Sequence, residues 1–193
     1  MNLNLENELL RIKDLDSRAK DVSEREEVLR RIKALYNQNQ TFKPLALLYL
    51  NILDRLFLEK ESISVVDGII EAKRIYDQHS RSEEVAEEYI RLLYNLSEKK
   101  DAKSELYIIG DEARRVYKQH SLSEEIAFFY SFVCLNWSFI QKEESTLKNT
   151  INQVKKVYNQ YPLSEEIALI YAMMLTNLSQ NQEEETALRI TAK

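Results

Sequence analysis

The chain has 193 residues, of which 44% are hydrophobic and 31% are charged, and its formal net charge is −5. This balance is typical of a soluble protein and disfavours a general nucleic-acid binder, which usually carries a clustered excess of basic residues. The chain contains only two glycines and two prolines. Because sheets and long loops need such residues in their turns, their scarcity predicts helices joined by short connections.

The sequence shows no pattern of export or of membrane insertion. Residues 1–20 place charges in every turn and lack the apolar core of a signal peptide. No apolar run approaches the roughly 18 residues needed to cross a bilayer. The single cysteine, Cys134, cannot form an internal disulfide, which is the usual mark of an oxidising compartment. We therefore expect a cytoplasmic protein that does not engage a membrane.

In chain order, the first predicted element is a helix over residues 3–18. Its Ile12 and Leu15 lie one repeat period before Leu53 and Leu56, so the helix has an apolar side and a polar outer side. We assign residues 1–22 to an N-terminal capping helix, because helical arrays need polar terminal elements. Residues 23–193 are then expected to form the array, with about four repeats and the last one incomplete.

A repeated tyrosine marks one class of predicted helix. The helices over residues 24–38, 62–79, 102–120 and 143–160 end near these tyrosines, and we name them the Tyr-helices. The tyrosines recur at intervals of 40, 41 and 41 residues: Tyr36, Tyr76, Tyr117 and Tyr158. A fixed period in this range indicates a stacked repeat array.

A second class of helix alternates with the first. We predict these helices over residues 41–58, 82–97, 123–140 and 164–179 and name them the Ser-helices. Their apolar residues fall at three-and-four spacing, which marks one broad buried face. Each carries a tyrosine thirteen residues after that of the preceding Tyr-helix: Tyr49, Tyr89, Tyr130 and Tyr171. Leu188 continues an apolar series of the Tyr-helices, so a fifth Tyr-helix is expected to begin near Glu183.

Serines and prolines predict where the helices begin. Ser121 precedes Glu124 by three residues, the spacing of a capping box, and Ser80 and Glu83 repeat it. Ser23 with Glu26 predicts the same cap for the first Tyr-helix. Ser164 is the expected N-cap of the last Ser-helix, and Pro44 is expected in the first turn of its helix, where a missing N–H costs nothing.

The last copy resembles the tetratricopeptide repeat, a helix–turn–helix unit of about 34 residues. Pro162 resembles the proline that ends that repeat, and Tyr171, Ala172 and Leu175 resemble the large–small–large core positions of its first helix. The period here is longer by about seven residues, close to two helical turns, so both helices can lengthen with their faces in phase. The resemblance implies an all-α α-solenoid, a right-handed superhelix of antiparallel helix pairs with the Ser-helices on its concave side.

The residues that could support catalysis have simpler interpretations. His79 and His120 lie at the ends of Tyr-helices, without a third metal ligand at useful spacing, and suit helix C-termini. Cys134 occupies a slot otherwise held by leucine, which predicts a buried, inert thiol. Gly68 and Gly110 lie in helical patterns and predict close packing. We expect no catalytic residue, no cofactor and no metal site, and so no enzyme.

Charged pairs form two ladders along the array. An acidic pair opens each of the last three Ser-helices, and a basic pair precedes each of the last three repeated tyrosines. The ladders could bind peptides of opposite charge. Alternatively, acids at helix N-termini and bases at C-termini each stabilise the helix by about 0.3–1 kcal/mol, which is the interpretation we favour. The basic pairs are Lys73-Arg74, Arg114-Arg115 and Lys155-Lys156.

Asparagines form a third ladder near the ends of the Ser-helices. An amide both donates and accepts hydrogen bonds, so it can pair with the backbone of an extended peptide. The alternative is that each asparagine closes the final turn of its own helix. The same helix surface carries aromatic, methionine and arginine side chains, which are typical interface anchors. The candidate binding residues are Arg91, Tyr94, Asn95, Phe128, Phe132, Asn136, Leu169, Met173 and Asn177.

These patterns together predict a non-catalytic scaffold whose concave face binds a protein or peptide segment. The first alternative is structural: copies of the chain associate, for example as a homodimer, through the open C-terminal edge of the array. A weaker alternative is RNA binding, since other repeats of helical pairs bind single strands. The acidic balance of the chain disfavours that alternative.

Overall fold

The computed structural model describes residues 3–59, 64–99, 104–141 and 143–191, with the side chains of residues 184–191 outside the description. Within these ranges the chain is all-α and has no strand. It divides into two compact units, Met1–Leu96 and Ser97–Lys193. All eight predicted repeat helices are present, and apart from the C-terminal end of the last one their ends agree with the sequence prediction to about one helical turn.

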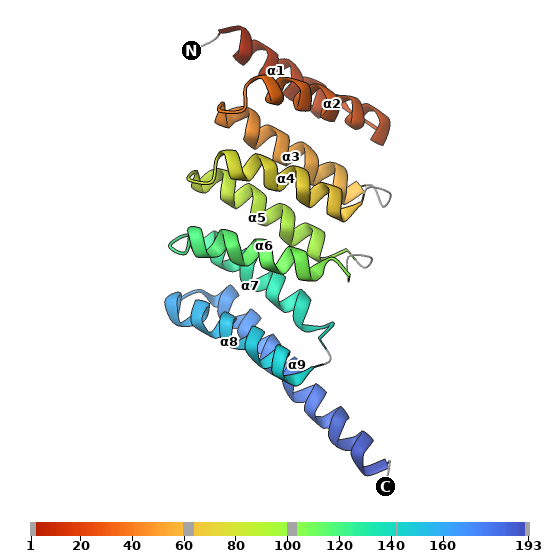
Figure 1. Ribbon diagram of the computed structural model, residues 1–193, viewed down its shortest axis with the longest axis vertical. Coiled ribbons are helices and arrows are strands. Elements are labelled where there is room, and N and C mark those ends of the chain that lie inside the picture. Colours follow the sequence, from red (N-terminus) through yellow and green to blue (C-terminus); the bar gives the residue numbers. More distant parts are fainter. Residues whose placement is uncertain (1–2, 60–63, 100–103, 142, 192–193) are drawn as a thin grey trace. The chain divides into compact units, whose positions relative to one another are not determined.

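The first unit contains the N-terminal helix and two helix pairs (Figure 1). Helix α1 packs against α2 and α3, α2 packs against α3, and α3 packs against α4. The helix predicted over residues 3–18 is α1. The bounds are α1 Leu3–Arg18, α2 Val22–Gln38, α3 Lys43–Glu59, α4 Val65–Gln78 and α5 Glu83–Ser97.

The second unit repeats the same alternation of Tyr-helices and Ser-helices (Figure 1). Helix α7 packs against α6, α8 and α9, and α8 packs against α9. Its bounds are α6 Leu106–Gln119, α7 Glu124–Ser138, α8 Glu144–Gln160 and α9 Glu165–Thr191. No helix in the described part of the chain combines the length and the apolar character that spanning a bilayer requires.

The repeated tyrosines meet in pairs. The tyrosine of each Tyr-helix packs its ring against the tyrosine of the following Ser-helix, with ring centroids 5.6, 5.0, 4.8 and 5.6 Å apart in the four copies. Aromatic pairs at such distances stabilise a core beyond the area that they bury. The thirteen-residue spacing in the sequence therefore records one ring contact per helix pair.

Two of the predicted caps are each wrong by two residues. Helix α2 is capped by Asp21, whose side chain accepts a hydrogen bond from the Glu24 amide, and not by Ser23. Helix α7 is capped by Ser123, which accepts from the Ile126 amide, and not by Ser121. The caps differ from the prediction because α7 begins later than Ser121 requires and α2 begins earlier than Ser23 requires. At α2 the Glu24 carboxylate also accepts from the Lys20 amide at 2.7 Å, so Asp21 and Glu24 cap this helix reciprocally.

The prediction of a fifth Tyr-helix beginning near Glu183 is wrong. Helix α9 continues from Glu165 to Thr191 without a turn. The segment around Glu183 contains glutamine and glutamate, which favour helix, and no glycine or proline that would end one. The side chain of Leu188, on which that prediction depended, lies outside the described residues.

Both glycines lie under an aromatic ring, as predicted from their helical context. A methyl group at Gly68 of α4 would overlap the Phe57 ring of α3. A methyl group at Gly110 of α6 would lie 3.1 Å from Trp137 Cε3 of α7. Glycine thus lets each Tyr-helix approach its neighbouring Ser-helix closely.

Candidate partner-binding surface

The structure divides the nine predicted binding residues between the two units. Arg91, Tyr94 and Asn95 lie on α5 of the first unit. The other six lie on α7 and α9 of the second unit, which pack against each other. They are Phe128, Phe132, Asn136, Leu169, Met173 and Asn177. The second unit therefore brings two thirds of the predicted set onto one pair of helices.

Four of these residues form what we name the α7–α9 apolar surface: Phe128, Phe132, Leu169 and Met173. The rings of Phe128 and Phe132 meet edge to face with centroids 5.8 Å apart, and both side chains are half-buried. Leu169 is 62% exposed and Met173 is 41% exposed. Large apolar side chains that gather on exposed surface are unusual in a protein without a partner.

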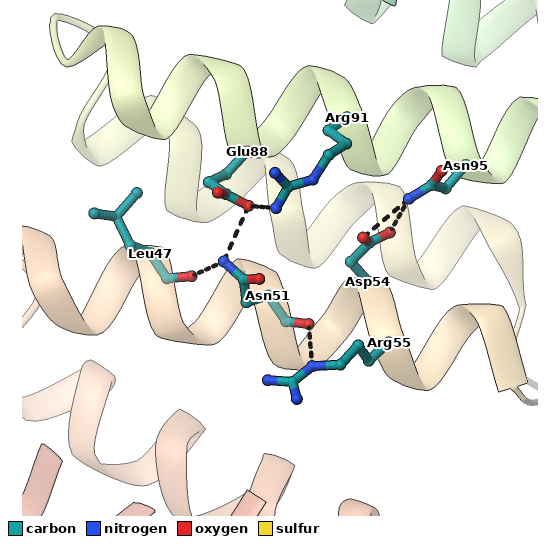
Figure 2. A network of polar contacts seen from close by, with 7 residues as sticks. All are labelled: Leu47, Asn51, Asp54, Arg55, Glu88, Arg91 and Asn95. Carbon is teal, nitrogen blue, oxygen red and sulfur yellow. Dashed lines mark hydrogen bonds and ion pairs between the residues drawn. The ribbon is translucent and has the colours of Figure 1, made fainter. Parts of the chain in front are cut away.

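In the first unit, polar residues at the repeat positions of Phe132 and Met173 bond to one shared carboxylate (Figure 2). The Asn51 amide donates to the Glu88 carboxylate at 3.0 Å and to the Leu47 carbonyl at 3.2 Å. The Arg91 guanidinium donates to the same carboxylate. Asn51 and Arg91 occupy the repeat positions that Phe132 and Met173 occupy in the second unit. In the first unit, residues at these positions therefore join α3 to α5.

Each asparagine of the ladder donates to a polar residue about forty positions before it in the sequence. Asn95 Nδ2 donates to both carboxylate oxygens of Asp54 at 2.9 Å, as Figure 2 shows. Asn136 Nδ2 donates to Ser97 Oγ at 2.9 Å. Asn177 Nδ2 donates to the Ser138 carbonyl and hydroxyl at 3.0 and 3.2 Å. These amide groups bond across helices and do not close their own final turns, so that interpretation is wrong.

The partners of this ladder follow the repeat as well. Asp16, Ser97 and Ser138 occupy one repeat slot, and Asp16 accepts from Arg55, the first member of the ladder. The same slot in α3 holds Phe57, which packs over Gly68, so Asn95 turns to Asp54 one helical turn earlier. Sequence reasoning found the ladder but not these partners. Aligning each asparagine with the polar residues about forty positions before it would have identified these partners.

Two acids accept hydrogen bonds from this ladder, Asp16 and Asp54, and Asp54 is the less buried of the two. It is 9% exposed, and burial raises the pKa of its carboxyl group, although the bond from Asn95 and the charges of Arg91 and Arg55 lower it. The Asn95 amide thus replaces part of the hydration that the buried carboxylate loses. Contact of the asparagines with a peptide backbone stays a prediction, and their amide nitrogens already donate to other residues of the chain.

A second polar cluster explains the basic ladder. Glu71 accepts hydrogen bonds from Tyr49 at 2.6 Å, Arg74 at 2.7 Å and Lys33 at 3.2 Å. Burial raises the pKa of Glu71, but these three donors together bring it below its usual value. Arg115 likewise pairs with Glu112 three residues before it, at 2.8 Å.

The basic residues therefore do not serve helix C-termini, and that interpretation is wrong. The last turns of α4 and α8, whose residues are all described, hold no basic residue. The acidic half of the interpretation is confirmed, since the glutamate pairs lie in the first turns of α5, α7 and α9. Lys43 of α3 pairs with Glu84 of α5 at 2.8 Å, so one contact also joins neighbouring Ser-helices.

The residues considered for catalysis occupy structural positions. Cys134 is 2% exposed, which confirms its predicted burial, and this burial raises the pKa of its thiol to about 12. His79 caps the end of α4, and its Nε2 lies 2.7 Å from the Gln40 carbonyl; His120 caps α6. Within the described ranges, no group of three or more His, Cys, Asp or Glu is placed to hold a metal ion.

No family model, no curated protein and no solved structure matches this chain. The resemblance to the tetratricopeptide repeat therefore rests on the sequence pattern of its last copy. The surface described above is the starting point for assigning a function.

Proposed function

We propose that the chain is a non-catalytic scaffold of the cytoplasm that binds a segment of a partner protein. In this proposal the helix pairs stack as tetratricopeptide-like repeats into a right-handed superhelix, with the Ser-helices on the concave side. The tyrosine pair in every copy and the asparagine ladder between successive Ser-helices support such stacking. Binding is assigned to the positions that differ between copies.

The observation that carries the proposal is the α7–α9 apolar surface. Two of its slots are polar in the first unit, where Asn51 and Arg91 share the Glu88 carboxylate. In the second unit the same slots hold Phe132 and Met173, with Phe128 and Leu169 one helical turn before them. Partly exposed aromatic and methionine side chains are enriched among residues that dominate binding energy. We assign this surface to a segment that presents two or more apolar side chains.

The test compares two double variants, each of which removes two partly exposed apolar side chains. Phe132→Ala with Met173→Ala removes the two central side chains of the surface. Leu58→Ala with Ile70→Ala removes exposed side chains from the first unit, 56% and 60% exposed. Peptides selected from a random displayed library on the wild-type chain should lose binding at least about tenfold on the first variant only. Circular dichroism and urea unfolding confirm that both variants fold.

Equal binding of the selected peptides to both double variants would place the binding site elsewhere. A library that yields no peptide enriched in apolar residues would also contradict the assignment. We avoid Asn136→Ala in this test because Asn136 donates to Ser97, and its loss would disturb the packing of the helices together with any binding.

A second candidate function, self-association, is favoured by the side of α9 that no helix in the described second unit covers. Leu175 is 42% exposed, whereas Leu53 of α3 and Cys134 of α7, at the same repeat slot, are 3% and 2% exposed. A second copy that covers this side would bury Leu175 as the array buries its counterparts. Sedimentation velocity over a hundredfold concentration range should then show a dimer that Leu175→Glu dissociates. A monomer at every concentration removes this candidate.

A further inference from the structure

We propose that a groove in the second unit, between α6 and α8, binds an acidic peptide segment through carboxylate contacts with Arg114, Lys155 and Lys156. This surface is separate from the α7–α9 apolar surface, and the proposal does not depend on that function. It makes use of the basic pair of α8, the one member of the basic ladder that the internal pairs with Glu71 and Glu112 do not explain.

The groove is open and has a volume of about 690 Å³. Arg114 of α6 and Trp137 of α7 line one part, and α8 lines the rest with residues that include Asn149, Lys155 and Lys156. The lining holds three cations, and the described residues that line it include no acid. A concave surface of one charge sign concentrates ligands of the opposite sign.

The repeat explains why these cations are available. Glu71 in α4 and Glu112 in α6 neutralise the cations three residues after them, Arg74 and Arg115. In α8 the same slot holds Gln153, whose Oε1 accepts from the Tyr130 hydroxyl at 2.6 Å just as Glu71 accepts from Tyr49. The replacement keeps the tyrosine hydrogen bond and removes the negative charge.

As a result, the basic pair of α8 has no carboxylate beside it. Lys155 and Lys156 are exposed, and neither forms an ion pair within the described part of the chain. The nearby acid of α8, Glu144, is already engaged with Lys148 at 2.8 Å and with Gln182 at 2.6 Å. On α6, Glu112 is paired with Arg115.

Arg114 adds a donor on the opposite wall. Its Nη1 lies 3.7 Å from the Asp111 carboxylate, which is longer than a normal hydrogen bond. The side chain is partly exposed, so its guanidinium can donate to an acceptor that enters the groove. A ligand carboxylate supplies two oxygens that match the planar guanidinium.

The polar lining indicates a peptide and not a compact anion or a nucleic acid. Asn149 and Asn152 line the groove one helical turn apart along α8, and their amides can pair with a peptide backbone. Trp137 offers an apolar contact at the same groove. The net charge of −5 disfavours a ligand with the charge density of RNA.

The decisive variant is Gln153→Glu, which restores the charge found in the other copies. The introduced carboxylate should accept the hydrogen bond from Tyr130, as Glu71 accepts from Tyr49. It should also neutralise the charge of the basic pair Lys155-Lys156. The matched control is Gln180→Glu, the same change at an exposed position of α9. If Gln153→Glu fails to fold, Lys156→Gln, at an exposed side chain, removes one cation with the same change in net charge.

The measurement is fluorescence anisotropy with a labelled peptide of alternating glutamate and alanine, at low salt. We expect the wild type and Gln180→Glu to bind it equally, and Gln153→Glu to bind about five- to tenfold more weakly. Affinity should fall with added salt. Failure of the wild type to bind the peptide overturns the proposal, and so do equal affinities of the two glutamate variants.

Two further probes define the ligand class. Inorganic phosphate and a uridine oligonucleotide serve as competitors for the labelled peptide. We expect neither to displace it at concentrations where the unlabelled peptide does. Displacement by phosphate alone would reassign the groove to small anions, and displacement by the oligonucleotide would reassign it to nucleic acid; either result contradicts the peptide proposal.

Discussion

The two units are built on one plan, and they differ at a small set of repeat positions. Both pair a tyrosine of each Tyr-helix with a tyrosine of the next Ser-helix. Yet the first unit fills two exposed Ser-helix slots with Asn51 and Arg91, and the second fills them with Phe132 and Met173. Positions that are equal in both units stabilise the fold. Positions that differ are where binding is to be sought.

The Tyr-helices show the same contrast in charge. Glu71 neutralises Lys33 and Arg74 in the first unit, whereas Gln153 leaves Lys155 and Lys156 of α8 without a paired carboxylate. In the first unit the Glu88 and Glu71 carboxylates therefore accept from the polar groups of both surfaces internally. The second unit leaves apolar side chains exposed on one surface and cations exposed on another, so we expect its partners to be external.

The largest expected difference concerns the tyrosine pairs. Tyr76 is fully buried and stacks on Tyr89, whereas Tyr158 and Tyr171 are only half-buried. Tyr76→Ala should lower the free energy of unfolding by about 3–5 kcal/mol, because it leaves a large cavity. Tyr158→Ala should cost about half as much, since solvent can fill the space. Urea unfolding followed by circular dichroism measures both, and equal losses would show that the pairs are energetically alike.

A smaller effect is expected from the asparagine ladder. Asn177→Ala should destabilise the second unit by about 1–3 kcal/mol, because the buried hydroxyl and carbonyl of Ser138 lose their donor. The control is Asn152→Ala on an exposed face of α8, where the change should stay within about 0.5 kcal/mol. Both variants gain the same helix propensity, so the difference between them isolates the hydrogen bonds. No difference would mean that the ladder does not hold the helices together.

Much of the fold follows from periodicity alone. Apolar spacing and the forty-residue period predicted the eight repeat helices, because one buried face per helix must recur wherever the same neighbours recur. The burial of Cys134 followed from the same periodicity, because leucine occupies this repeat position in the other copies. The exact caps did not follow. More than one side chain can cap each of these helix starts, Asp21 or Ser23 at α2 and Ser121 or Ser123 at α7, and the residue at which the helix begins decides which one accepts the bond.

The candidate surface was predictable only in part. The sequence placed Phe132 and Met173 at equal slots, which is enough to expect them on one surface. It could not show that Asn136 is bonded to Ser97, since a polar side chain near a helix end has several partners within reach. The groove lined by α8 could not be predicted from the sequence for a similar reason. Gln153 matters only because Glu71 proved to be the internal partner of the basic residues.

A third comparison concerns the glycines under aromatic rings. Gly68→Ala should destabilise the first unit by about 1–2 kcal/mol, since a methyl group there overlaps the Phe57 ring and outweighs the gain in helix propensity. Gly110→Ala should be nearly neutral, because the added methyl group lies 3.1 Å from the Trp137 ring, which can shift slightly. Thermal unfolding of the two variants measures this. A larger loss at Gly110 would contradict the difference in packing between the units.

The smallest effect is a difference in pH dependence at Glu71. Its pKa lies below the usual value because Tyr49, Arg74 and Lys33 donate to the carboxylate, so its ionised form stabilises the fold. That stabilisation is present above the unfolded-state pKa, near 4.5, and is lost as the pH falls through the lower folded-state pKa. Glu71→Gln copies the residue that the second unit has at this slot and should lower the free energy of unfolding by about 1 kcal/mol at pH 7.

The gap between the wild type and Glu71→Gln should narrow as the pH falls from about 5 to 3, because both side chains are then uncharged. Subtracting the two unfolding curves removes the titration of all other carboxylates, which the chains share. In the reverse change, Gln153→Glu, Lys156 should act as Arg74 does and add stability that is likewise lost in acid. A gap that stays constant with pH would mean that Glu71 contributes through its hydrogen-bond geometry alone, and the units would then differ in charge without differing in stability.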